Sequence, residues 1–183
     1  MAITFFQKKE IDKTQDILTK YLDSDFRVFP MAENKTSKKE IEKFEEEIGI
    51  LLTKEFKAHL LGRFPGIYVE VLEEKWPRPK EYDVGPFWTF LYGLHTFTGS
   101  SESDDWMRMN YNYYQMLETA NQRAVPILKI IGDADVYCIN ENSNIVRFKH
   151  EENKFDAIDC DFWQLLDNEI SELKKRKDRK INP

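Results

Sequence analysis

The chain has few of the residues that build disulfide frameworks, metal sites or membrane spans. It contains only 2 cysteines, Cys138 and Cys160, too few for a disulfide framework and too far apart in sequence to make a zinc site by themselves. No apolar run approaches the ~20 residues that a transmembrane helix needs. Charged residues interrupt the first 30 positions, which argues against a signal peptide. These absences predict a cytoplasmic protein that does not enter a membrane.

Basic residues are outnumbered by acidic ones, and the net charge is −6. Phosphate binding requires clustered Lys and Arg, so the composition argues against a nucleic-acid-binding protein. The acidity is concentrated in residues 131–172, whose 11 acidic and 3 basic side chains give a net charge of −8. Residues 173–183 have a net charge of +5. A strongly acidic segment suits either solubility or a basic partner.

Groups that could carry out catalysis are sparse. His59, His95 and His150 are scattered over a predicted helix, a strand end and a turn, without the spacing of metal ligands. Asp133 and Asp135 supply two carboxylates, whereas calcium takes roughly six to eight oxygen ligands. No phosphate-binding glycine loop and no Gly-x-Ser-x-Gly sequence occurs. We therefore expect a protein that is not an enzyme and that binds no metal or cofactor.

Three amphipathic helices are predicted in the first third of the chain. Apolar residues at helical spacing place the first over 10–22. The second begins at Ser37, the first residue of a capping-box sequence, and ends at Gly49. Thr53 is the expected N-cap of a third, which ends near Gly62.

The middle of the chain reads as strands and turns followed by one helix. Strands are predicted over 67–72 and 87–94, with the proline-rich and glycine-rich stretch 76–86 as a loop between them. A helix is predicted over 104–122. Its apolar face would comprise Trp106, Met109, Tyr113 and Met116 or Leu117.

The last third predicts a meander of short strands and a final helix. Strands are expected over 125–131, 136–139, 145–149 and 154–158, joined by turns too short for crossover helices. Asp161 is the expected N-cap of the final helix. That helix would pack on the sheet through Phe162, Leu165, Leu166, Ile170 and Leu173.

The order of helices, strands and a closing helix predicts an α+β fold. It would consist of N-terminal helices, a central, mainly antiparallel sheet and a C-terminal amphipathic helix packed on that sheet. We expect one domain over residues 1–173. The basic C-terminal tail, 174–183, would extend the last helix and favour its dipole.

Two parts of the chain resemble the SUKH superfamily. Residues 37–50 and 52–60 look like the family's opening helix, its break at glycine and its short second helix. Residues 125–133, 135–139, 145–148 and 161–166 look like its late strands and closing helix. This superfamily joins fungal regulators of cell-wall synthesis and killer-toxin resistance to bacterial immunity proteins of polymorphic-toxin systems. The resemblance implies a SUKH-like fold and a role in protein binding.

The resemblance, the acidic segment and the lack of catalytic groups favour a non-enzymatic immunity protein. It would bind and neutralise a cognate, basic toxin domain such as a nuclease. The alternative is an intracellular scaffold or regulator like the fungal members. The sequence sets no oligomeric state. Acidic residues on turns and aromatic anchors make up the candidate partner-binding set: Asp133, Asp135, Glu141, Glu151, Glu152, Trp76, Trp88, Trp106 and Tyr111.

Overall fold

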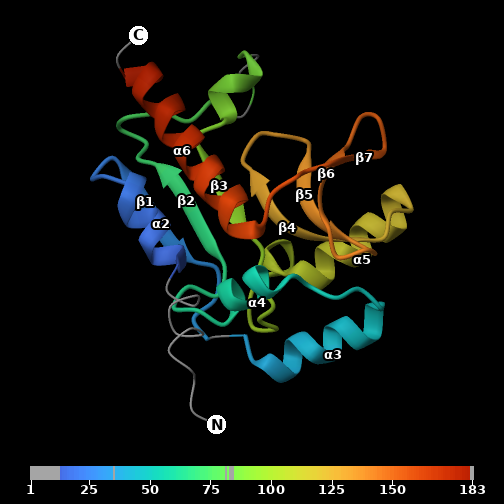
Figure 1. The fold of residues 1–183 in the computed structure, drawn as a ribbon. Helices are drawn as coiled ribbons and strands as arrows, with labels where there is room; N and C mark the ends of the chain where they lie inside the picture. Colours follow the sequence, from blue (N-terminus) through green and yellow to red (C-terminus); the bar gives the residue numbers. More distant parts are fainter. Residues whose placement is uncertain (1–12, 35, 81, 83–84, 182–183) are drawn as a thin grey trace.

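The computed structural model describes residues 13–34, 36–80, 82 and 85–181, and it confirms the α+β fold (Figure 1). Seven strands form one antiparallel sheet in which every strand pairs with its neighbours in sequence, in the order β1-β2-β3-β4-β5-β6-β7. The strands are β1 Phe26–Pro30, β2 Ile67–Val71, β3 Gly93–Thr96, β4 Ala124–Ile130, β5 Val136–Asn140, β6 Ile145–Lys149 and β7 Lys154–Ala157. The α-helices are α2 Lys13–Tyr21, α3 Lys38–Ile48, α4 Lys54–Leu60, α5 Met109–Ala120 and α6 Phe162–Ile181.

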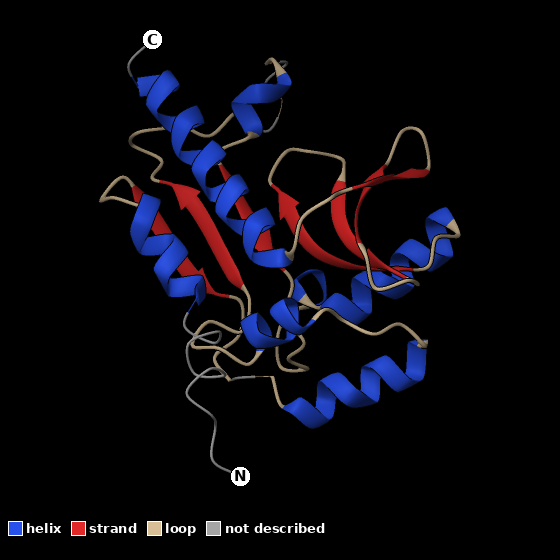
Figure 2. Cartoon of the chain, in the orientation of Figure 1, coloured by secondary structure: helices blue, strands red, loops and turns tan. Residues whose placement is uncertain are grey.

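Helices pack on both faces of the sheet (Figure 2). Helix α6 contacts α2, α4 and β3 on one face, and α5 packs against β4 on the other. The alternation of side chains along each strand separates these faces. Tyr137 of β5 accordingly reaches α6, whereas the adjacent Val136 lies beside α5. Within the described part of the chain, no helix is both long and apolar enough to cross a membrane.

Local sequence signals place most helix ends correctly. Ser37 and Glu40 form the predicted capping box at the start of α3, and Gly49 ends that helix in the left-handed region at φ 72°. The Thr53 side chain accepts a hydrogen bond from the backbone N–H of Phe56 at the start of α4. The structure confirms both predicted caps. They could be predicted from the sequence because the groups that form them lie within a few residues of one another.

The first predicted helix is confirmed from Lys13 onward as α2, and its residues 10–12 lie outside the described part of the chain. A strand that the sequence did not predict, β1, follows and forms the edge of the sheet. It is short and ends in a proline, so its own pattern is weak. Five residue pairs with β2 establish it.

The strand predicted over 87–94 is wrong in its first half. Residues Phe87–Phe90 form a 3-10 helix, η1, because the carbonyl oxygen of Pro86 accepts hydrogen bonds from both the backbone N–H and the hydroxyl of Thr89. Those bonds close a turn, and the chain becomes a strand only at Gly93. Phe87 and Trp88 therefore lie exposed on the connection between β2 and β3.

The helix predicted over 104–122 is divided. A 3-10 helix, η2 (Asp105–Met107), precedes α5. The buried face of α5 contains Met109, Tyr113 and Met116 as expected, but Trp106 lies on η2 and is 46% exposed. Its assignment to the buried face is wrong, because Arg108 adopts an extended conformation that breaks the helical phase.

The four late strands and the closing helix are confirmed. Asp161 caps α6: its side chain accepts from the backbone N–H of Gln164, whose side chain accepts from Asp161 N–H in return. Helix α6 runs without a break to Ile181, so the basic tail does extend it. Within that extension Lys177 is only 4% exposed.

Candidate partner-binding surface

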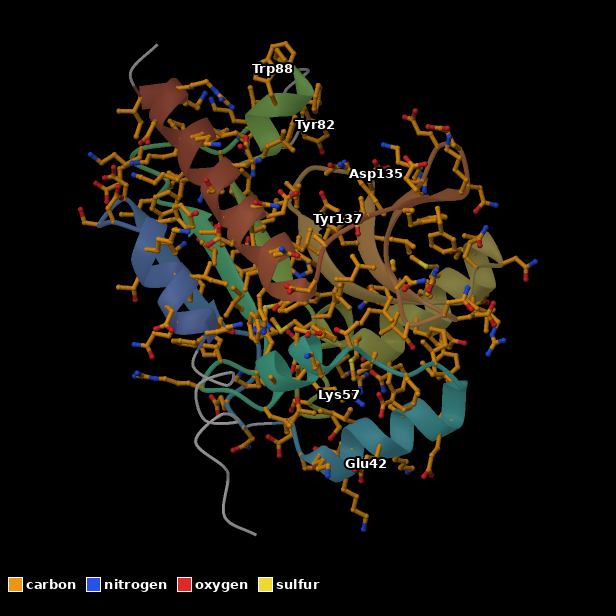
Figure 3. All side chains as sticks on the ribbon, viewed as in Figure 1. Glu42, Lys57, Tyr82, Trp88, Asp135 and Tyr137 are labelled. Carbon is orange, nitrogen blue, oxygen red and sulfur yellow. The ribbon has the colours of Figure 1, made fainter. Side chains whose placement is uncertain are left out.

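Three connections meet at one end of the sheet, because consecutive antiparallel strands turn alternately at opposite ends. They are β2–β3, β4–β5 and β6–β7. We call their described residues, 72–80, 82, 85–92, 131–135 and 150–153, the sheet-end surface. In Figure 3, Trp88, Tyr82 and Asp135 all lie toward this end. Five of the nine candidate residues project there: Trp88, Asp133, Asp135, Glu151 and Glu152.

The β2–β3 connection carries large, uncovered aromatic side chains. Tyr82 is 88% exposed, Phe87 67% and Trp88 58%. The rings of Phe87 and Trp88 meet edge to face with centroids 5.7 Å apart. Exposed apolar groups of this size are typical of contact sites, and Trp and Tyr are enriched among the residues that dominate binding energy.

Two hydrogen bonds fix the base of this connection to the rest of the fold. The indole N–H of Trp76 donates to the carbonyl oxygen of Thr89 at 3.0 Å. From α6, Arg176 Nε donates to the carbonyl oxygen of Leu91 at 3.3 Å. Trp76 is 3% exposed, so the expectation that it anchors a partner is wrong. The sequence does not show which tryptophan of this connection is buried, because its burial depends on contacts with α6.

The β4–β5 turn lies directly against the β2–β3 connection. Gly132 has φ 82°, and a Cβ atom there would lie 2.5 Å from Cβ of Phe90. Only glycine allows this approach and this backbone conformation without strain. The aromatic loop and the turn that carries Asp133 and Asp135 therefore form a continuous surface.

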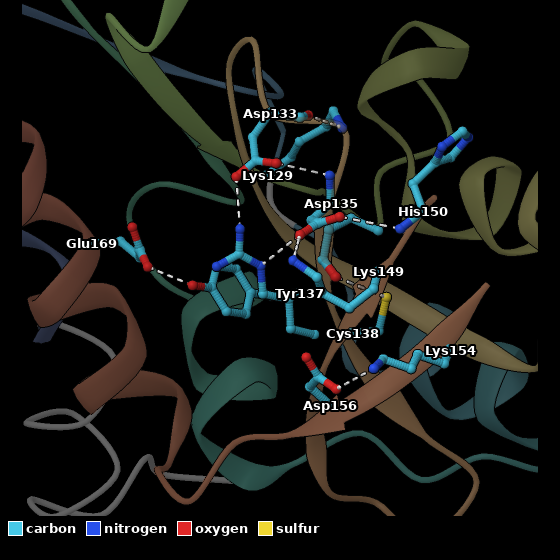
Figure 4. A network of polar contacts seen from close by, with 12 residues as sticks. Lys129, Asp133, Asp135, Tyr137, Cys138, Lys149, His150, Lys154, Asp156 and Glu169 are labelled. Carbon is cyan, nitrogen blue, oxygen red and sulfur yellow. Dashed lines mark hydrogen bonds and ion pairs between the residues drawn. The ribbon is translucent and has the colours of Figure 1, made fainter. Parts of the chain in front are cut away.

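The two turn carboxylates are already paired with cations (Figure 4). Arg147 Nη2 lies 2.8 Å from Asp133 Oδ2, and Arg147 Nε lies 3.1 Å from Asp135 Oδ2. Lys149 also pairs with Asp135 Oδ2, and the backbone N–H of His150 donates to Asp135 Oδ1 at 3.1 Å. The expected free acidic rim is at this point a neutralised network.

Burial and hydrogen bonding act in opposite directions on Asp135. Burial by itself would raise its pKa, but the hydrogen bonds from Lys149 and from the His150 backbone, with the charge of Arg147, lower the pKa below its usual value. On the α6 side, the Tyr137 hydroxyl donates to Glu169 at 2.6 Å, and burial together with that carboxylate raises the pKa of Tyr137. Arg147 lies over the Tyr137 ring at 5.5 Å, so the network connects the turn to α6.

The remaining candidates differ in their surroundings. Glu151 and Glu152 are exposed on the β6–β7 turn, where Glu152 pairs with Lys154 and Glu151 has no ion pair among the described residues. Glu141 lies at the opposite end of the sheet and pairs with Arg123. The structure therefore does not bring all the acidic candidates together.

Trp106 and Tyr111 lie away from the sheet-end surface. Trp106 packs edge-on against Tyr68 and His95, with centroids 6.4 and 5.5 Å apart, over the β2–β3 part of the sheet. Tyr111 is 39% exposed on α5. Phe87 and Tyr82 are not among the nine candidate residues, yet both are more exposed than any candidate tryptophan. The sequence signal that could have identified them is the predicted proline-rich loop in which or beside which they lie, because loop side chains are often exposed.

The histidines do not form a common site. His59 is fully buried between the hydroxyls of Thr14 and Thr96, both 2.7 Å from its ring nitrogens. His95 is buried under Trp106, and His150 is exposed on the β6–β7 turn. Within the described residues, no three His, Cys, Asp or Glu side chains are arranged to hold a metal ion.

Comparison of the chain with known protein families, curated proteins and solved structures gives no match. The SUKH resemblance therefore stays a prediction drawn from the sequence.

Proposed function

We propose that this chain is a cytoplasmic, non-enzymatic immunity protein that binds and neutralises a cognate toxin domain through the sheet-end surface. The observation that carries the proposal is the uncovered Phe87–Trp88 pair, with Tyr82, on a loop whose base is fixed to the fold. A rigid base lowers the entropy that binding must overcome. Protein interfaces depend on a few such aromatic anchors.

A basic partner fits the charge distribution. Ion pairs neutralise Asp133 and Asp135 locally, but the long-range field depends on net charge, and residues 131–172 have a net charge of −8. That field would accelerate encounter with a cationic protein, while the aromatic anchors would set the lifetime of the complex. Added salt should therefore slow association more than it accelerates dissociation.

The test is capture of the partner from native lysate followed by a toxicity assay. The tagged protein and its Trp88→Ala variant are used as baits, and the captured chain is then expressed with and without each of them. We expect a stoichiometric basic partner whose toxic activity is abolished at equimolar wild-type protein. We expect Trp88 to become buried in the complex. Removal of an anchor of this type weakens binding by about 2 kcal/mol or more, so Trp88→Ala should lower affinity at least tenfold.

Tyr111→Ala is the matched control, because it removes an exposed aromatic side chain far from the sheet-end surface. It should bind and protect like the wild type. A partner that stays fully active at equimolar protein would exclude the immunity role. Capture of non-toxic signalling or cell-wall proteins would instead support the scaffold alternative. If Trp88→Ala and Tyr111→Ala changed the affinity equally, the sheet-end surface would not be the interface.

A further inference from the structure

Strand β7 forms one of the two edges of the sheet (Figure 1). The backbone N–H of Ile158 donates to the carbonyl oxygen of Ile145 at 3.2 Å and so continues the pairing of β7 with β6. Because only alternate residues of an antiparallel strand bond to a given neighbour, the N–H and C=O groups of Phe155 and Ala157 point away from β6. Among the described residues these outward groups have no hydrogen-bond partner. A free edge of this kind is a template for another strand.

The opposite edge, β1, is protected. The hydrogen bonds that flank β1 orient the backbone of Phe26, Val28 and Pro30 outward. The Phe26 N–H already donates to the carbonyl oxygen of Asp23 at 3.2 Å, and proline has no N–H. In the described part of β1, only Val28 therefore keeps a free outward donor. Proline is one of the devices that prevent pairing at an edge, and β7 contains none.

The β7 edge lies in acidic surroundings. Residues 151–159 contain 4 acidic side chains and 1 basic side chain, a net charge of −3, and the one cation, Lys154, pairs with Glu152. The adjacent polar network does not change this balance, because its cations and carboxylates are equal in number (Figure 4). They are Lys129, Arg147 and Lys149 against Asp133, Asp135 and Glu169. An added strand with basic side chains would therefore meet complementary charge.

Asp156 is the carboxylate best placed to receive such a strand. It lies between the two residues whose backbone faces outward, and its side chain is 51% exposed. Its one ion pair among the described residues is with Lys154, at 3.9 Å. A lysine or arginine opposite Asp156 would form a cross-strand ion pair, which is favourable in antiparallel sheets.

We propose that β7 binds an extended, basic segment of the partner as an added antiparallel strand. The residues of that segment opposite Phe155 and Ala157 exchange backbone hydrogen bonds with them, and the residue between lies opposite Asp156. The backbone bonds give affinity, and the alternate side chains give specificity. The site adjoins the sheet-end surface at the β6–β7 turn. The proposal rests on the proposed function only for the source of the segment, the cognate toxin domain.

The first test is an NMR titration of the isotope-labelled protein with the peptide acetyl-Lys-Thr-Val-Lys-Val-Thr-Lys-amide. Its central lysine matches Asp156, and its valines match Phe155 and Ala157. We expect saturable shifts centred on the amides of Phe155 and Ala157, with slower hydrogen exchange at both. Methylation of the two valine nitrogens removes their donors without changing the charge, so it should weaken binding at least tenfold. Replacement of the three lysines by glutamate should abolish binding.

Two variants test the same pairing from the side of the protein. Ala157→Pro removes an outward N–H that does not bond to β6, a position where an edge strand tolerates proline. Asp156→Lys reverses the charge between the two bonding residues. Each should weaken binding of the lysine peptide at least tenfold. Glu42→Lys makes the same charge change at an exposed side chain of α3 and, as the control, should leave binding unchanged.

The proposal is overturned if the lysine peptide gives no saturable shift, or if its N-methylated form binds the wild type equally well, whether or not the variants fold. Protection of Phe155 and Ala157 that rises with protein concentration in the absence of peptide would show that a second copy occupies the edge, which also overturns it.

Binding of the cognate toxin domain separates this proposal from the proposed function. We expect Ala157→Pro to weaken that binding at least tenfold. A toxin that binds Ala157→Pro like the wild type but loses affinity for Trp88→Ala would overturn the edge site and leave the immunity role intact. Specific binding of the lysine peptide by a protein that does not neutralise the toxin would support the edge site and exclude the immunity role.

Discussion

At the scale of single residues, the buried histidines show how the core handles groups that can be charged. His59 accepts or donates one hydrogen bond at each ring nitrogen, to Thr14 and Thr96, and so links α2, α4 and β3. Burial lowers its pKa to about 3. Burial also lowers the pKa of His95 to about 4, where the ring packs on Tyr68 and under Trp106. Both histidines are therefore neutral in the folded protein near neutral pH.

Stability should fall as the pH is lowered from 7.5 to 5. In the unfolded chain His95 and His59 become protonated near pH 6.5, whereas in the folded chain they do so only near pH 4 and pH 3, respectively. The unfolded state thus binds more protons below about 6.5, and the stability conferred by the neutral rings is complete above that pH and lost below it. At pH 5 the loss amounts to about 2 kcal/mol for each histidine. Urea unfolding at the two pH values measures it.

His150→Gln is the control for this pH dependence, because His150 is exposed. It should leave the loss between pH 7.5 and 5 unchanged. A wild-type free energy of unfolding that is equal at both pH values would contradict the assignment of neutral, buried rings.

At the scale of elements, the connections matter more than the strands. The β4–β5 turn supports the aromatic β2–β3 connection where Gly132 meets Phe90. The same turn is tied to β6 through Asp133, Asp135 and Arg147. A substitution in the turn should therefore change the environment of Trp88, although Trp88 is far from the turn in sequence.

Gly132→Ala should loosen this joint. The new Cβ would lie 2.5 Å from Phe90 Cβ and 2.9 Å from its backbone carbon, at a φ of 82° that alanine adopts only with strain. We expect a loss of about 2 kcal/mol or more in the free energy of unfolding, together with a shift in tryptophan fluorescence and weaker partner binding. Urea titrations and binding assays measure these effects.

Gly85→Ala is the matched control in the same connection. Among the described residues, a Cβ there would approach only the Thr89 side chain, at 3.2 Å from its hydroxyl oxygen, and the backbone needs no positive φ. Gly85→Ala should keep near wild-type stability and binding. If Gly132→Ala also did so, the two connections would not depend on each other.

At the scale of the whole molecule, the last turns of α6 belong to the fold. Lys177 lies 3.1 Å from Asp23 and 3.0 Å from Asp25, in the link between α2 and β1. Burial alone would raise the pKa of Asp23, but hydrogen bonds from the Asp25 backbone and from Lys177 and Lys174 lower it to about 2. Lys180 also lies over the ring of Trp76 at 5.3 Å. The basic segment thus attaches the end of α6 to the link between α2 and β1 and to the β2–β3 connection.

Truncation after Leu173 should destabilise the protein by on the order of 3 kcal/mol, because it removes the Lys177 ion pairs and the Arg176 bond to Leu91. The pKa of Asp23, followed by NMR, should rise toward its ordinary value. Arg179→Gln, at an exposed side chain of the same segment, serves as the control and should leave both unchanged. Full stability of the truncated chain would restore the view of residues 174–183 as a separate tail.

The sequence by itself determined the elements whose signals are local. The caps at Ser37, Thr53 and Asp161 act over a few residues, and the late strands alternate with turns too short for any arrangement but a meander. Apolar spacing likewise identified the buried stripe of α6. From these the α+β class and the helix-covered antiparallel sheet could be predicted.

Only the tertiary structure decided which candidate residues are available to a partner. Trp76 and Trp88 lie in the same connection, yet one is buried and the other exposed, because α6 covers only the base of the loop, through Arg176 and Lys180. Asp133 and Asp135 form ion pairs with Arg147, a residue of β6, and are therefore not free to pair with a partner. Strand β1 likewise depends on β2, a partner far away in sequence. Contacts of that range leave no periodic pattern in the chain, so they arise only when the sheet has formed.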